Sequence, residues 1–81
     1  MSVEKIQVLG TGCPKCQKLE ENARAAIQEL GLDVAVEKVT DIAQIARMGV
    51  MMTPALAVDG HVRSTGHLLS VSQVKTLLSQ G

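Results

Sequence analysis

The pattern of apolar and polar positions changes along the chain between one typical of strands and one typical of helices. These changes divide the chain into seven short segments. Runs rich in apolar and β-branched residues predict strands at 5–9, 34–39, 55–58 and 61–64. The dipeptide Asp59-Gly60 favours a tight turn, so the last two strands are expected to form an antiparallel hairpin.

Apolar residues recur every three or four positions in the three remaining segments, which predicts helices. The longest begins at Pro14, because proline is tolerated in the first turn of a helix, and Gly31 is a typical terminator. Its buried face is predicted to contain Leu19, Ala23, Ala26, Ile27 and Leu30.

Two shorter helices carry local start signals. Thr40 or Asp41 can cap a short helix that contains Ile42, Ala43, Ile45 and Ala46 and is ended by Gly49. Ser70 and Gln73 match a capping box, in which each side chain bonds the free backbone N–H of the other residue. The apolar face of this last helix is predicted to contain Val71, Val74, Leu77 and Leu78.

The resulting order is β-α-β-α-β-β-α, which predicts an α/β fold with a four-stranded mixed sheet and three helices. The first β-α-β unit is expected to be parallel, and helices are expected on both faces of the sheet. With 81 residues, the chain is expected to form one domain over residues 1–81.

Composition narrows the classes of function. The formal net charge is zero, which removes the usual electrostatic attraction to nucleic acids and anionic membranes. The chain contains no Phe, Trp or Tyr, so a platform for stacking bases is missing. No stretch approaches the ~20 apolar residues of a membrane span, and residues 1–5 lack the pattern of a signal peptide, so we expect a cytoplasmic protein.

The chemistry of the chain is concentrated at Cys13 and Cys16, two cysteines separated by two residues at a predicted helix start. Unsatisfied N–H groups and the helix dipole would stabilise a thiolate at Cys13, so we expect its pKa to fall below the ~8.5 of a free thiol. Lys15 adds positive charge, and Pro14 stiffens the turn. Cys16, one helical turn further on, is expected to be less exposed. This asymmetry suits thiol–disulfide exchange, with Cys13 as nucleophile and Cys16 as resolving thiol.

The segments 10–19 (GTGCPKCQKL) and 49–60 (GVMMTPALAVDG) resemble those of small thioredoxin- and glutaredoxin-like redox proteins. The resemblance extends from Lys5 to Leu78 and implies a thioredoxin-like fold. It also implies a cis Pro54 beside Cys13, with the backbone of Thr53 turned outward to pair with a substrate peptide. Gly66 is expected to permit close approach of a partner chain.

Several positions depart from the thioredoxin pattern. Gln7 stands where thioredoxins have a buried aspartate, which leaves the proton acceptor for Cys16 unidentified. Residues 66–69 replace the signature with which glutaredoxins bind glutathione. Met51 and Met52 either line the substrate groove or belong to the core, and His67 is either a proton shuttle or an ordinary loop residue.

We therefore predict a protein-disulfide reductase that uses no cofactor and no metal, is recharged by an unidentified reductase and is a monomer. The alternative is a soft-metal carrier that binds Cu(I) or Zn(II) through the same two cysteines. Such carriers end in a strand, whereas residues 70–78 have helical periodicity, and they usually have methionine at the position of Thr11. A non-catalytic binding module with vestigial cysteines is the third possibility.

Overall fold

The computed structural model describes residues 4–12 and 14–79. Its four strands form one sheet in the order β2-β1-β3-β4. They are β1 (Lys5–Leu9), β2 (Ala35–Val39), β3 (Ala55–Val58) and β4 (His61–Thr65). Strand β1 runs parallel to β2 and antiparallel to β3, and β3 forms an antiparallel hairpin with β4. The predicted mixed sheet is confirmed.

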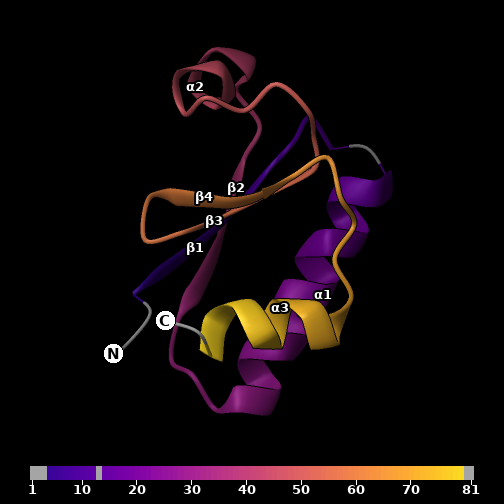
Figure 1. Cartoon of the computed structure of the whole chain (residues 1–81), viewed down its shortest axis with the longest axis vertical. Coiled ribbons are helices and arrows are strands. Elements are labelled where there is room, and N and C mark those ends of the chain that lie inside the picture. The colour runs from indigo at the N-terminus through magenta and orange to yellow at the C-terminus, as the bar shows by residue number, and fades with distance from the viewer. Residues whose placement is uncertain (1–3, 13, 80–81) are drawn as a thin grey trace.

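In the described part of the chain, helices cover both faces of this sheet (Figure 1). They are α1 (Pro14–Leu30), α2 (Ile42–Arg47) and α3 (Val71–Ser79). Helices α1 and α3 lie side by side and share one hydrophobic core with β1 and β3, whereas the short α2 packs on the opposite face. The predicted order of elements and their placement on both faces are therefore confirmed.

The two cores follow from the alternation of side chains along β1. Ile6 and Val8 point toward α1 and α3, and Leu9 points toward the core that contains Ile45 of α2. Ala23 of α1 is completely buried against the sheet, and its small side chain allows the helix backbone to approach closely. A core without aromatic residues is therefore filled both by aliphatic side chains such as Leu19 and Leu56 and by close approach of the helix at Ala23.

The local signals at the helix ends have the geometry predicted from the sequence. Asp41 caps α2, because its carboxylate accepts a hydrogen bond of 2.9 Å from the backbone N–H of Ala43. The capping box before α3 is formed in both directions: the N–H of Ser70 donates to Gln73 Oε1 at 2.8 Å, and the N–H of Gln73 donates to Ser70 Oγ at 3.2 Å. These bonds satisfy N–H groups that the helices leave unpaired.

One end of the sheet brings together segments that are far apart in the sequence. Gly10 extends the pairing of β1, since its N–H donates to Val39 O at 2.9 Å, and the chain then passes to the start of α1. At the same end, the N–H of Gly66 after β4 donates to Pro54 O before β3 at 2.8 Å. The loops that carry the predicted redox site therefore meet at this end.

Candidate functional site

Cys16 lies in the first turn of α1 and has 5% of its surface exposed. The other predicted redox residue, Cys13, lies outside the described residues. In the sequence it directly precedes Pro14, the first residue of α1. Pro14 and Lys15 are both exposed at the start of this helix.

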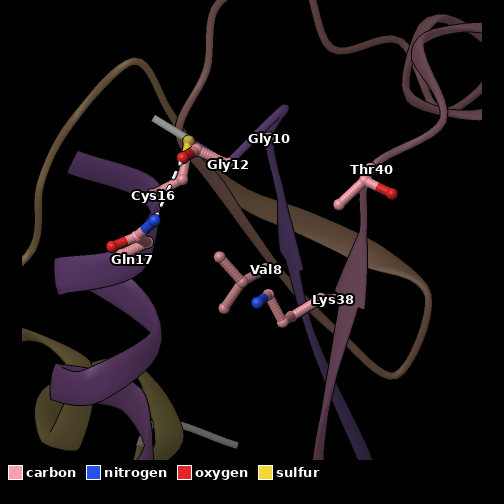
Figure 2. A pocket seen from close by; sticks show the side chains of 7 residues that line it. All are labelled: Val8, Gly10, Gly12, Cys16, Gln17, Lys38 and Thr40. Carbon is pink, nitrogen blue, oxygen red and sulfur yellow. Dashed lines mark hydrogen bonds between the residues drawn. The ribbon is translucent and has the colours of Figure 1, made fainter. Parts of the chain in front are cut away.

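A small pocket opens beside Cys16, between the start of α1 and the ends of β1 and β2 (Figure 2). The Gln17 side chain donates a hydrogen bond of 3.2 Å to Gly12 O, which ties the start of the helix to the loop before it. The pocket is lined by Val8, Gly10, Gly12, Cys16, Gln17, Lys38 and Thr40.

Gly10 is the point at which the two predicted motifs approach each other. A β-carbon built on Gly10 would overlap the sulfur of Cys16 and would lie 3.8 Å from Cβ of Thr53. The buried cysteine of α1 and the residue before Pro54 are therefore neighbours around the end of β1, although 37 positions separate them in the numbering.

The second motif has one exposed and one buried residue. Thr53 is exposed, Pro54 is completely buried, and the peptide bond between them is cis. Gly66 is held next to this segment by its hydrogen bond to Pro54 O. The structure therefore brings Cys16, Thr53, Pro54 and Gly66 to one region.

Apolar side chains are exposed on the same segments. Met51 is 96% exposed and Met52 is 65% exposed, so neither belongs to the core. A β-carbon at Gly66 would lie 3.2 Å from Cβ of Met52, so these two residues pack closely together. His67 is an exposed residue of the loop that follows. Exposed thioethers give this region a flexible apolar surface.

Charged groups lie one turn further along α1. The Glu20 carboxylate accepts hydrogen bonds from Arg24 at 2.8 and 3.1 Å and forms an ion pair with Lys38 at 3.5 Å. The hydrogen bond from Arg24, aided by the positive charge of Lys38, holds the pKa of Glu20 below its ordinary value. Lys38 connects this cluster with the pocket beside Cys16.

Replacing Glu20 by glutamine is expected to lower the free energy of unfolding at neutral pH by about 0.5–1 kcal/mol. Because the pKa of Glu20 is lowered in the folded protein, its stabilisation is present above the pKa of the unfolded chain and is lost as the pH falls through the folded value. Urea denaturation at neutral pH and in acid checks this, with Glu21→Gln as the exposed control. A loss of equal size at both pH values would contradict the assignment.

Gln7, the residue at the position of the thioredoxin aspartate, is buried on β1. Its side-chain amide donates to Glu37 Oε1 at 3.5 Å. Over residues 4–12 and 14–79, no group of three or more His, Cys, Asp and Glu side chains is placed to hold a metal ion. Within the same ranges, no helix is long and apolar enough to span a membrane.

The residues of this site that the sequence did not indicate include Lys38 and Thr40, which line the pocket, and Gly10, which lies against the Cys16 sulfur. In the sequence, Gly10 stands out only as part of the segment 10–19 that carries the resemblance. Lys38 lies on β2 and Thr40 follows Val39, the last residue of that strand, so their spacing of two could have placed them on one face. Only the pairing of β1 with β2 shows that this face is turned toward Cys16.

The chain has a thioredoxin-type architecture. Its features are a mixed four-stranded sheet, a cysteine in the first turn of α1 and, beside that cysteine, a proline directly before β3. Residues 4–79 match the thioredoxin domain family, so the chain belongs to that family. It is 47% identical over 75 residues to a thioredoxin of Methanothermobacter thermautotrophicus, covering 93% of this chain and 97% of that protein. It is also 43% identical over 70 residues to a thioredoxin of Methanocaldococcus jannaschii, covering 86% of this chain and 80% of the relative. These relationships support a thioredoxin-like redox function.

Proposed function

We propose that the chain is a thiol–disulfide oxidoreductase that reduces disulfide bonds of proteins through Cys13 and Cys16. The observation that carries this proposal is the burial of Cys16 in the first turn of α1, next to Thr53 and one turn after Cys13 in the sequence. The names of the two relatives support the same class of activity.

The reaction proceeds in two exchange steps. The thiolate of Cys13 attacks one sulfur of the substrate disulfide, forms a mixed disulfide and releases the other substrate sulfur as a thiolate. Cys16 then loses its proton to water and attacks the sulfur of Cys13. This second step closes a Cys13–Cys16 disulfide and releases the second substrate thiolate. The substrate gains two electrons and the protein loses two, so a reductase has to restore the dithiol.

The roles of the two cysteines follow from exposure and from the helix. A residue at the start of a 17-residue helix benefits from free N–H groups and from the positive end of the helix dipole, which favours a thiolate at Cys13. Cys16 is buried, so a large substrate cannot reach it first. The attacking thiol is therefore Cys13, and the resolving thiol is Cys16.

The substrate peptide binds along the exposed segment that leads into β3. Thr53 is exposed and lies near Gly10, so its backbone is available to pair with an extended peptide. Met51 and Met52 supply apolar contact area, and Gly66 lies close to Met52. Pro14 and Lys15, exposed at the start of α1, supply further contacts to the substrate. This arrangement favours an unfolded or flexible protein segment over a small polar disulfide.

Reduction of insulin disulfides tests the proposal. With dithiothreitol as the electron donor, the wild-type chain is expected to accelerate insulin precipitation over the reaction without protein. The Cys13→Ser/Cys16→Ser variant is the matched control and is expected to give the background rate. Replacing dithiothreitol by thioredoxin reductase with NADPH, or by glutathione, identifies the class of electron donor.

Two results would overturn this function. Wild-type protein that gives only the background rate with all three donors is not a disulfide reductase. Tight 1:1 binding of Cu(I) by such an inactive protein would establish the soft-metal carrier instead.

A further inference from the structure

The backbone conformation of Gly10 does not explain why this position has a glycine. Gly12, Gly31, Gly49, Gly60 and Gly66 have positive φ, whereas Gly10 does not. Its N–H makes an ordinary sheet hydrogen bond to Val39 O, so any L residue could adopt this conformation. The requirement for glycine has to come from the surroundings.

The surroundings of Gly10 are dominated by Cys16. A β-carbon at position 10 would overlap the Cys16 sulfur and would lie 3.1 Å from Cβ of Cys16, whereas Cβ of Thr53 would be at an ordinary 3.8 Å. Cys16 belongs to α1 and is buried, so its backbone cannot retreat without moving the start of the helix. The sulfur of Cys16 thus occupies the space that a side chain at position 10 would fill.

We propose that Gly10 is the positioning residue of the resolving thiol: its missing side chain lets the Cys16 sulfur lie against the end of β1, aligned to attack the mixed disulfide on Cys13. This inference rests on the proposed function. In the step concerned, the Cys16 thiolate forms a bond to the Cys13 sulfur, the bond between Cys13 and the substrate breaks, and the substrate leaves as a thiolate. Attack on a disulfide requires alignment of three sulfurs, so a displaced Cys16 reacts more slowly.

A methyl group at position 10 is therefore expected to slow only the second exchange step. It pushes the Cys16 sulfur away from β1, but it does not touch the first exchange step, which uses only Cys13 and the substrate. The Gly10→Ala variant is expected to form the mixed disulfide at the wild-type rate and to resolve it about tenfold to a hundredfold more slowly.

Stopped-flow reaction of the reduced chain with the aromatic disulfide dithiobis(nitrobenzoate) separates the two steps. The first thionitrobenzoate released reports attack by Cys13, and the second reports attack by Cys16. Wild-type protein is expected to release both quickly, and Gly10→Ala is expected to release the first quickly and the second slowly. Gly31→Ala is the control: it strains a glycine at φ +69 at the far end of α1, where nothing lies within 4 Å, and is expected to leave both phases unchanged.

The outcomes separate this inference from the proposed function. If wild-type protein releases only the first thionitrobenzoate and keeps the second as a stable mixed disulfide on Cys13, the two-cysteine exchange itself is wrong. If wild-type protein and Gly10→Ala release the second thionitrobenzoate equally fast, the exchange stands and the role of Gly10 is wrong. A slow second phase in Gly31→Ala as well would assign the effect to general destabilisation and would also overturn the role of Gly10.

A second variant covers the case in which Gly10→Ala does not fold. Removing the sulfur removes the overlap, so Gly10→Ala/Cys16→Ala is then expected to fold with the circular dichroism spectrum of Cys16→Ala. Failure of this double variant to fold would show that the methyl group is excluded by something other than the Cys16 sulfur, which contradicts the inference.

Discussion

Cys13→Ser is expected to lower insulin reduction to the rate measured without protein, whereas Cys16→Ser is expected to accumulate a mixed disulfide with the substrate. Serine is a far weaker nucleophile than a thiolate at neutral pH, so the first variant cannot begin the exchange. The second variant begins it but has no internal thiol to finish it. Both substitutions change one atom and preserve the shape of the side chain.

Mass spectrometry distinguishes the two variants after reaction with a peptide that contains one disulfide. Cys16→Ser is expected to gain the mass of the half-peptide at Cys13, and Cys13→Ser is expected to remain unmodified, because Cys16 is 5% exposed. Modification of Cys13→Ser at the same rate as Cys16→Ser would contradict the assigned roles, and modification of Cys13→Ser alone would reverse them. Equal insulin reduction by both variants and the wild-type chain would exclude exchange through this pair.

The sequence predicted the elements best where the signal is local. The capping box of Ser70 and Gln73, the Asp41 cap and the turn at Asp59-Gly60 each depend on residues at most three positions apart, and each has its predicted geometry or place. Element ends shifted by one or two residues: β2 begins at Ala35 and α2 ends at Arg47. Ends are set by packing and fraying as well as by local preference.

The candidate site was predicted only in part, for a physical reason. The spacing of Cys13 and Cys16 shows in the sequence, and the resemblance to known redox proteins pointed to Thr53 and Pro54. The contact between Gly10 and Cys16 does not show there, because it depends on how α1 crosses the end of β1. Lys38 reaches the pocket only through the parallel pairing of β2 with β1. Contacts of this kind belong to tertiary packing, which a periodic pattern does not specify.

Leu19→Ala is expected to be the most destabilising of the single substitutions considered, at about 2–5 kcal/mol. Leu19 is completely buried on α1 and packs in the same core as Ile6 and Val8 of β1, so truncation removes apolar contacts and leaves a cavity. Chemical denaturation measures the loss. Ile42→Ala removes a similar side chain that is 70% exposed on α2, and this control is expected to lose less than about 0.5 kcal/mol.

The consequence of this loss is large because of the composition of the core. Domains of this size are stable by only about 5–15 kcal/mol, and this chain has no aromatic side chain to carry a large share of that total. Leu19 also follows Cys16 by three positions, so both occupy the same face of α1 and are held against the sheet together. A cavity at Leu19 is therefore expected to loosen the start of α1. To measure this, each substitution is introduced into the Cys13→Ser variant and the fraction of Cys16 labelled by a thiol reagent is determined. This fraction is expected to rise with Leu19→Ala and to stay unchanged with Ile42→Ala. Equal labelling of Cys16 with Leu19→Ala and with Ile42→Ala would show that the start of α1 is held in place independently of this core.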